Sequence, residues 1–596
     1  MITWRYFIKT GIALLLVPLA AVHAADAPKP GRPNVLFLMA DDWSSPHAGV
    51  LGDPVVKTPT FDRVAREGVL FHNAYVSSPS CTPSRLAVAT GQWHWRLEDG
   101  ANLGGSLREG VPVYPELMQA AGYQIGFARK GAAPSDYKYT HRDPFGPRFK
   151  TFEEFVAQRK AGTPFCFWYG AGEPHRPYRY EEGRKDGMDP AKVKLPACLP
   201  DNETSRNDFC DYLHRVQQYD SDCARMLALL EKSGELENTI VVMSGDNGLP
   251  FPRCKATLYD TGTHVPLAIR WGAKARGGRT IQDFVSLTDL APTFLEACGL
   301  PVPKDMTGRS LMPLLISNRD GQIDPQRDHV LTGMERHVYP YPSRAIRTAD
   351  FLYIRNFNPA NWPTGAQEGR PEPVDFAKTP WPTGPGAFSH NVDPSPSKQW
   401  MLVNPGPLNA QAFGPRPEEE LYDLKRDPDQ LRNVAADPAH AETRRRLAEQ
   451  LARELRGSGD PRVAGAREAR GISGWTVHVS RDLLAEEPGA MALAFNLLNP
   501  QLEEIVGVLP PQAVEELRKV PLYFSPEYPG ATPAAEFHPD AGWLRDNGRD
   551  PEMAKGIEFT NIRIFEREVN RMPNFVLHEL AHPLFIRRLA LLRSPW

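Results

Sequence analysis

One short segment of the sequence places a potential nucleophile beside a helix-starting proline and a cation: Ser80-Cys81-Thr82-Pro83-Ser84-Arg85. Pro83 favours the first turn of a helix, so we expect Cys81 at the positive amino end of that helix. Arg85 follows about one turn later, where it can hold an anion beside the cysteine. A cysteine placed in this way is expected to have a depressed pKa and to be reactive. The alternative is a buried, inert thiol at the start of a helix.

Other polar residues follow directly after four apolar segments. We expect these segments to be buried strands, at 35–40, 124–128, 164–169 and 239–244. They are followed by Asp41 and Asp42, by Lys130, by Glu173-Pro174-His175, and by Asp246-Asn247-Gly248. Helical segments such as 60–67 and 208–231 lie between them. Alternating strands and helices predict a mainly parallel sheet, in which ligands bind at the carboxyl ends of the strands.

The pattern Cys81-x-Pro83-Ser84-Arg85, followed by Thr90-Gly91, resembles the signature of the sulfatase family. The resemblance covers about residues 33–461 and extends to the polar groups after the four strands and to Lys255. Within the family, the sequence is most similar to members related to heparan N-sulfatase (sulfamidase). The segments that carry this closer similarity are 246–252, 258–259, 262–263, 341–344 and 420–423.

The resemblance implies a fold class. It is an α/β fold of the alkaline-phosphatase type, with a mainly parallel sheet flanked by helices and a smaller C-terminal α+β subdomain. We expect an extra, mainly helical tail after it. The expected boundaries are a catalytic domain at 33–345, its C-terminal subdomain at 346–462, a linker at 463–474 and a tail at 475–596.

The resemblance also implies a cofactor set. Cys81 would be oxidised to formylglycine by a dedicated maturation enzyme. One Ca²⁺ would be bound by Asp41, Asp42, the modified Cys81, Asp246 and Asn247. Carboxylate and amide oxygens are hard ligands, which suit Ca²⁺ better than a soft metal.

The implied reaction is the hydrolysis of a sulfate ester or sulfamate of a glycosaminoglycan-type sugar. One hydroxyl of the hydrated formylglycine would attack sulfur, with Asp246 as the candidate base. Arg85, Lys130 and Lys255 would neutralise the charge on the sulfuryl oxygens, and His175 would protonate the leaving atom. Tentative substrate-binding residues are Glu335, Arg336 and His337; a surface loop is an equal alternative for these three.

One feature departs from the family pattern. In many sulfatases the lysine after this strand begins a Lys-x-His motif, but here the run is Lys130-Gly131-Ala132. The histidine that contacts the nucleophile or the leaving group is therefore missing from its usual place. His47, His94 and His264 are candidates to replace it.

The first 24 residues are predicted to be a cleaved signal peptide. Arg5 and Lys9 precede an apolar run over 11–22, which ends in small residues near Ala24. The run is shorter than the ~20 residues that span a bilayer, so no stable membrane insertion is expected. We therefore expect a periplasmic or secreted protein. Export would permit disulfides among the six cysteines other than Cys81.

The tail carries His578-Glu579-Leu580-Ala581-His582, which resembles the motif of a metallopeptidase-like domain. On a helix both histidines share one face, with Glu579 beside them as a base for zinc-bound water. Residues 583–596 contain no further His, Glu, Asp or Cys, and Pro583 interrupts the helix. We therefore expect an incomplete domain, with Zn²⁺ only if the motif is functional.

Charge and composition exclude other classes of function. The sequence has 69 Lys+Arg and 72 Asp+Glu, for a net charge of -3, which argues against a general nucleic-acid binder. With 41% hydrophobic and 24% charged residues, it has the composition of a globular protein. The main prediction is an exported sulfatase. The alternatives are a phosphoryl hydrolase of the same fold and a non-catalytic glycan-binding protein with a decayed site; the oligomeric state is left open.

Overall fold

The computed structural model describes residues 31–139, 141–366, 372–384, 386–463, 467–528, 532–547 and 549–582. Within them, an eight-stranded sheet forms the centre of the largest part of the molecule. Its order is β4 (Arg148–Phe149), β3 (Gln124–Arg129), β5 (Phe165–Gly170), β1 (Asn34–Ala40), β6 (Thr239–Gly245), β7 (Leu267–Arg270), β2 (Val69–Tyr75) and β8 (Arg279–Ser286). Only β7 runs antiparallel to its two neighbours.

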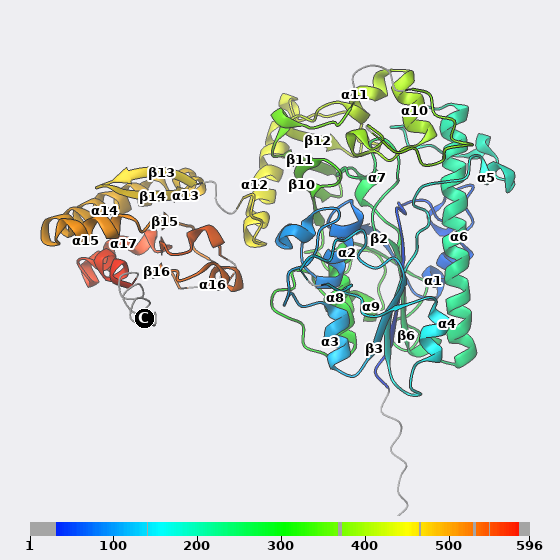
Figure 1. Cartoon of the computed structure of the whole chain (residues 1–596), viewed down its shortest axis with the longest axis horizontal. Coiled ribbons are helices and arrows are strands. Elements are labelled where there is room, and N and C mark those ends of the chain that lie inside the picture. The colour runs from blue at the N-terminus through cyan, green and yellow to red at the C-terminus, as the bar shows by residue number, and fades with distance from the viewer. Residues whose placement is uncertain are drawn as a thin grey trace, which may run out of the picture.

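Helices cover both faces of this sheet (Figure 1). One face packs against α2 (Cys81–Thr90), α3 (Tyr114–Ala120), α8 (Leu290–Ala297) and α9 (Met312–Ile316). The other face packs against α1 (Pro59–Glu67), α4 (Phe152–Ala157) and the long α6 (Glu203–Ser233). Alternate residues of β1 enter the two cores, because successive side chains of a strand point to opposite faces. The predicted parallel sheet flanked by helices is confirmed.

The four predicted strands are β3, β5, β1 and β6, which are neighbours in this order. They read as continuous apolar runs because both faces of each strand are buried. Since all four are parallel, their carboxyl ends meet at one edge. Short elements complete this region: α5 (Glu182–Lys185) and α7 (Asp260–Thr263).

A second, antiparallel sheet of four strands forms the smaller subdomain. Its order is β12 (Glu419–Asp423), β11 (Phe351–Asn356), β10 (Pro340–Thr348) and β9 (His329–Arg336). Helix α12 (Ala441–Gly457) packs Leu447, Leu451 and Leu455 against it. The boundary predicted between residues 345 and 346 is wrong, because it falls inside β10 and leaves β9 on the other side of the division. The hairpin from β9 to β10 belongs to this subdomain as a unit.

The Pro-, Gly- and Asn-rich stretch from 356 to 417 is not only surface loop. It contains α10 (Pro396–Val403) and α11 (Pro407–Phe413). Some of its polar side chains, such as Asp393 and Lys398, are buried. This stretch crosses the carboxyl edge of the large sheet and brings Asp393 there.

The tail contains a five-stranded sheet of its own. Its order is β13 (Arg467–Ile472), β14 (Trp475–Ser480), β15 (Leu522–Phe524), β17 (Ile557–Phe559) and β16 (Ala535–Phe537). The helices are α13 (Arg481–Glu486), α14 (Pro488–Val508), α15 (Pro511–Arg518), α16 (Ala541–Asp546) and α17 (Phe565–Arg571). Figure 1 shows this unit beyond α12. One prediction is wrong here, because the 463–474 linker contains β13. Helices make up most of the regular structure of the tail, as predicted, but they surround a sheet that the sequence analysis did not predict.

Several sequence predictions concern features at the margins of this fold. The predicted signal peptide at 1–24 lies outside the described residues. Within the described chain, no helix is long and apolar enough to cross a membrane.

All seven cysteines are described, and each is a buried free thiol. The Sγ atoms of Cys198 and Cys254 lie 3.9 Å apart.

Candidate active site

Three carboxylates meet where β1 and β6 end. Asp41, Asp42 and Asp246 are buried, and one oxygen of each lies within 4.8 Å of the others. The backbone holds them there, since Asp246 N donates to Ala40 O at 3.1 Å and Asp41 N donates to Glu173 O at 3.0 Å. The Asp246 side chain also accepts from the backbone N–H of Asp42 at 2.9 Å. Adjacent parallel strands thus place three acidic groups in one spot.

Asn247 adds a neutral oxygen to this cluster. Its Nδ2 donates to Asp42 Oδ1 at 2.6 Å and to Gly248 O at 3.1 Å. Its Oδ1 is buried and has no hydrogen-bond partner among the described residues. An orphaned buried oxygen is costly unless a ligand uses it. Three carboxylates and one free amide oxygen therefore fit a hard cation, and the predicted metal ligands are brought together.

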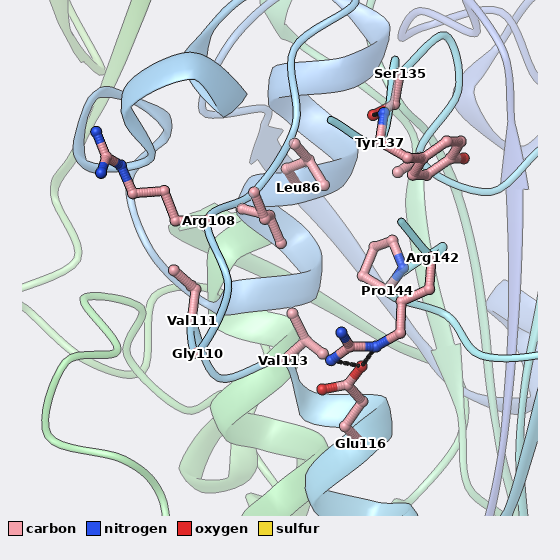
Figure 2. Close-up of a pocket in the computed structure, with 12 residues that line it drawn as sticks. Leu86, Arg108, Gly110, Val111, Val113, Glu116, Ser135, Tyr137, Arg142 and Pro144 are labelled. Atoms are coloured by element: carbon pink, nitrogen blue, oxygen red, sulfur yellow. Dashed lines mark hydrogen bonds and ion pairs between the residues drawn. The ribbon is translucent and has the colours of Figure 1, made fainter. Parts of the chain in front are cut away.

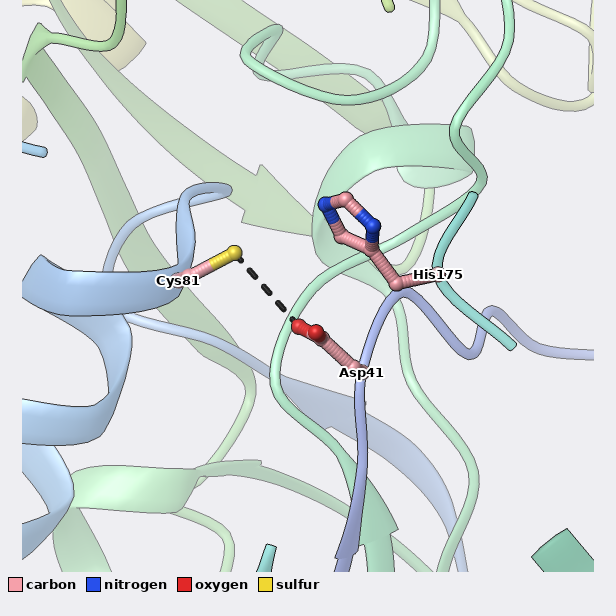
Figure 3. A group of neighbouring side chains, drawn as sticks. All are labelled: Asp41, Cys81 and His175. Carbon is pink, nitrogen blue, oxygen red and sulfur yellow. Dashed lines mark hydrogen bonds between the residues drawn. The ribbon is translucent and has the colours of Figure 1, made fainter. Parts of the chain in front are cut away.

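Cys81 is the first residue of α2, and its Sγ lies 3.5 Å from Asp41 Oδ1. Figure 3 shows the thiol pointing toward the Asp41 carboxylate, with the His175 ring beside both groups. All ten residues of α2 are buried. The depressed pKa predicted for this thiol is wrong: burial raises the pKa of Cys81, although Lys130 and Lys255 oppose the rise. The helix amino end does not outweigh the loss of water around the thiol.

Arg85 ties α2 to the strand ends. Its Nε donates to Asp246 Oδ2 at 2.7 Å, and its Nη1 donates to the carbonyls of Lys130 and Gly131 at 3.2 and 3.0 Å. The guanidinium is fully buried. Arg85 therefore fixes the position of Cys81 relative to the carboxylates as well as supplying charge.

Two lysines complete the ring of cations. Lys130 Nζ donates to both oxygens of Asp41, at 2.6 and 2.7 Å. Lys255 Nζ lies 2.9 Å from Asp42 Oδ1 and 3.4 Å from Asp393 Oδ2. Burial opposes both charges, but the carboxylates raise the pKa of each lysine, so both are cations.

The same contacts shift the pKa values of two of the carboxyl groups in opposite directions. Burial acts to raise the pKa of Asp41, but Lys130 and His175 bring it well below its usual value. Burial, opposed by Arg85, raises the pKa of Asp246 to about 6. Asp41 is therefore a permanent anion in the metal-free protein, while Asp246 is the group that can gain or lose a proton near neutral pH.

His175 lies on the solvent side of the cluster. Its Nε2 is 3.8 Å from Asp42 Oδ2. It forms one potential ligand group with Asp41 and Cys81, and another with Asp42 and Asp393. In the second group Lys255 already provides a cation between the two carboxylates. Sequence analysis missed Asp393, since no motif or strand end marked it.

The three tentative substrate-binding residues separate in the structure. Glu335 pairs with Arg344 and Arg462 and belongs to a structural ion-pair network. Arg336 is exposed at the end of β9. His337 is 4% exposed, and its Nδ1 lies 2.8 Å from Ser80 Oγ, next to Cys81. Burial, reinforced by Lys255, lowers the pKa of His337 to about 3, so it is neutral. Only His337 lies at the site.

The histidines proposed to fill the missing position have other partners. His47 pairs with Asp53, His94 with Ser77, and His264 with the carbonyl of His72. Ala132 itself is buried and lines a small cavity beside α2. Figure 2 shows this cavity, closed on one side by the Arg142–Glu116 ion pair. Two other histidines lie at the site: His175 comes within 4.8 Å of Cys81, and His337 contacts the neighbouring Ser80.

The motif in the tail is also assembled. His578, Glu579 and His582 offer ligand atoms that lie within 4.8 Å of one another. Both histidines are exposed, and Glu579 is partly buried. Burial raises the pKa of Glu579. Residues 583–596 lie outside the described part of the chain.

Comparison with known proteins agrees with this geometry. Residues 33–300 match the family model described as "Sulfatase", and residues 253–362 match "N-sulphoglucosamine sulphohydrolase, C-terminal". The two matches together span the large sheet, the carboxylate cluster and α2. This part of the chain belongs to the sulfatase family.

Curated relatives match well beyond these two segments. The sulfatase is 27% identical to an ulvan-active sulfatase of Formosa agariphila, over 73% of this chain and 77% of the relative. It is also 27% identical to the N-sulphoglucosamine sulphohydrolase of Homo sapiens, over 72% of this chain and 91% of the relative. The predicted resemblance to sulfamidase-like sulfatases is thus confirmed.

Solved structures share the fold. One is described as a complex with its substrate D-glucosamine-2-N,6-O-disulfate; it has a TM-score of 0.53 and 21% identity, covering 72% of this chain and 98% of that chain. A phosphonate monoester hydrolase of Silicibacter pomeroyi has a TM-score of 0.53 and 19% identity, covering 71% and 95%. At these identities the likeness establishes the fold alone.

Proposed function

We propose that this sulfatase hydrolyses a sulfate ester or sulfamate of a sulfated saccharide, with the residue at position 81 as the nucleophile. The observation that carries the proposal is the place of Cys81, 3.5 Å from the Asp41 carboxylate and inside a ring of Arg85, Lys130 and Lys255. A sulfuryl group in transfer spreads negative charge over its oxygens. Fixed cations in a site with little water stabilise such charge strongly.

We propose that Cys81 acts only after oxidation to formylglycine by a maturation enzyme. A buried thiol with a raised pKa is a poor nucleophile, because the thiolate is the reactive form. Formylglycine supplies a hydrated aldehyde, one hydroxyl of which can attack sulfur. The chain's own contribution is to hold that group at the start of α2, with Arg85 bonded to Asp246 and to the backbone after β3.

We propose Ca²⁺ as the metal of this site. Asp41, Asp42, Asp246, Asn247 and the modified residue 81 would hold it, and the free Asn247 oxygen supports this assignment. When bound, the ion neutralises charge on the substrate and on the nucleophile. Asp246, whose pKa is about 6, is the carboxylate suited to accept a proton from the nucleophile.

His175 is the proposed acid for the leaving atom. It is partly exposed on the open side of the carboxylates, where a sugar would enter, and its Nε2 faces the site 3.8 Å from Asp42. The sulfated substrate class is supported by the names of the relatives, which include sulfatases of ulvan, of N-acetylglucosamine-6-O-sulfate and of N-sulphoglucosamine. A periplasmic or secreted location is part of the same proposal, through the predicted signal peptide.

The test is sulfate release from a panel of N- and O-sulfated saccharides, with Cys81→Ala as the inactive control. Peptide mass spectrometry of protein made in a maturation-competent host should find an aldehyde at position 81. A persistent thiol there would refute the formylglycine mechanism. Phosphate release from a parallel panel of phosphate and phosphonate esters, without sulfate release, would identify a phosphoryl hydrolase instead. Release of neither would favour the glycan-binding alternative.

A further inference from the structure

The residues that line a cavity beside the loop after β6 include two arginines, a tyrosine and a histidine that have no role in the proposed reaction. These four are Arg253, Arg416, Tyr341 and His390. The cavity lies between the loop that follows β6, the face of β10 and β11, and the segment around α11. Its volume, for the centres of water-sized groups, is about 30 Å³. One buried water needs ~10–15 Å³, so a small polar group fits but a sugar ring does not.

Neither arginine has a carboxylate partner among the described residues. Arg253 is 3% exposed; it donates to the Gln430 carbonyl and lies over the Tyr259 ring at 3.6 Å. Arg416 donates to the Gln411 carbonyl. Burying the Arg253 charge without a counterion is unfavourable, and buried arginines are nearly always paired for this reason; Arg416 is only partly buried.

Among the described residues that line the cavity, the only carboxylate is that of Glu420, and it is already hydrogen-bonded to other groups. Glu420 accepts from Asn356 at 2.9 Å, from the Tyr259 hydroxyl at 2.7 Å and from the Tyr422 hydroxyl at 2.6 Å. Its three donors are neutral, so the cavity keeps one positive charge in excess. His390 does not change this balance, because burial, reinforced by Lys398 and Arg416, lowers its pKa to about 4.

Three buried polar atoms of the lining have no hydrogen-bond partner in the part of the chain that the structure describes. They are Arg253 Nη1, the Tyr341 hydroxyl and His390 Nδ1. Tyr341, like Arg253, is more than nine-tenths buried. A guanidinium N–H and a hydroxyl are donors, and a neutral imidazole nitrogen can donate as well. A ligand that offers only acceptors and one or more negative charges satisfies all of them.

We propose that this cavity is a second anion-binding subsite, which takes a sulfate or carboxylate group. The cavity lies close to the reacting groups, so the anion that it binds would be a second charged group on the same saccharide substrate. Arg253 is two residues from Lys255, and Val392, which lines the cavity, directly precedes Asp393. Two residues span at most ~7 Å, so the subsite lies within reach of a neighbouring anionic group on the substrate. The assignment to a group on the substrate rests on the proposed function. Free inorganic sulfate is the other anion that could occupy the cavity.

The test compares wild type with Arg253→Met and Tyr341→Phe on three substrates: 4-nitrophenyl sulfate, a monosulfated disaccharide and the same disaccharide with a second sulfate. A charge-assisted bond to the second sulfate predicts that each variant loses roughly tenfold or more of the wild-type preference for the doubly sulfated disaccharide. Activity on 4-nitrophenyl sulfate, which has no second anion, should stay unchanged. Arg355→Met, an exposed arginine on β11 paired with Glu418, is the matched control.

Calorimetric titration with inorganic sulfate distinguishes a cavity that binds a sulfate of the substrate from one that binds free sulfate. If free anion occupies the cavity, wild type binds two sulfates and Arg253→Met binds one, with the disaccharide preference unchanged. If neither the preference nor the stoichiometry changes in the variants, the subsite does not exist. This titration needs no turnover, so it decides the inference even if wild type releases no sulfate from any ester and the proposed function fails.

Discussion

At the scale of single residues, the site depends on how two lysines are held. Lys130 binds Asp41, while Lys255 binds both Asp42 and Asp393. Asp393 is 5% exposed and reaches the site from outside the large sheet. It therefore positions Lys255 without belonging to the carboxylate cluster itself.

Asp393→Asn should lower kcat/KM by about 10- to 100-fold, as the loss of an outer partner of a charged site does. Lys255 would then be held from one side only. The measurement is steady-state sulfate release, with circular dichroism to show that the fold is retained. Asp375→Asn, on an exposed side chain of the same segment, should have no effect. Equal activity of Asp393→Asn and wild type would contradict this positioning role.

The pKa of Asp246 predicts a pH dependence of metal binding. In the metal-free protein this pKa is about 6, against an ordinary value of 3.8. Between these values the native state holds a proton that the unfolded chain has released, so this group's stabilising contribution is greatest below pH 3.8 and is lost as pH rises toward 6. A cation needs the ionised form, so Ca²⁺ affinity should fall by about tenfold for each pH unit below the pKa.

Calorimetric Ca²⁺ titrations of chelator-treated protein at pH 7 and pH 5 measure this effect. Asp246→Asn, which cannot titrate, should bind more weakly but with little change between the two pH values. The same affinity in wild type at both pH values would show that Asp246 does not control metal binding.

Most residues of the candidate site were predictable because each follows a buried strand. Asp41, Lys130, His175 and Asp246 stand out as polar residues at the ends of apolar runs. Asp393 does not, because its segment has no periodicity and its role appears only when the chain folds over the sheet edge. The pKa of Cys81 was predicted with the wrong sign, because sequence reveals a helix start but not that the whole helix is buried.

At the scale of elements, a buried ion-pair network fastens the second sheet to the segment after α12. Arg344 on β10 pairs with Asp460 and with Glu335, and Arg462 also pairs with Glu335. Both Arg344 and Asp460 are fully buried. Removing the arginine would leave Asp460 buried and unpaired.

Arg344→Met should therefore destabilise this part of the molecule by about 3–5 kcal/mol. Urea unfolding followed by tryptophan fluorescence measures the loss. Arg445→Met, on the exposed face of α12, should cost less than about 1 kcal/mol. Similar values for the two variants would mean that the buried network contributes no more than a surface pair.

The strands of the tail show why element prediction failed there. β15, β16 and β17 are three residues long, too short for an alternating or continuous apolar pattern to be seen. The domain boundary predicted between residues 345 and 346 was wrong for a different reason. Proline and glycine residues do not mark the division uniquely, because Gly321 and Pro325 precede β9 while Pro340 and Pro342 lie within β10 itself.

At the scale of the whole molecule, the tail has a hydrophobic core of its own. Trp475, Leu498, Leu522 and Phe559 are among the residues that fill it, and none of its members comes from the sulfatase part. A separate core predicts separate unfolding. Scanning calorimetry of the full chain should show two transitions.

Truncation after residue 463 should remove one transition and leave kcat/KM for sulfate release unchanged. A large loss of activity would show that the tail supports the catalytic site. Zinc binding by His578 and His582 stays a prediction, and zinc titration of the full chain beside a His578→Ala/His582→Ala variant measures it.

The burial of Cys81 constrains the order of events during biosynthesis. The residue is 2% exposed and begins a helix whose every side chain is enclosed. An oxidising enzyme needs the thiol within its own pocket, and the folded chain does not offer it. The modification that we propose would therefore have to precede folding, and it would compete in time with the collapse of the large sheet. Faster folding of a variant would then lower the fraction of active molecules, even where every side chain of the site is intact.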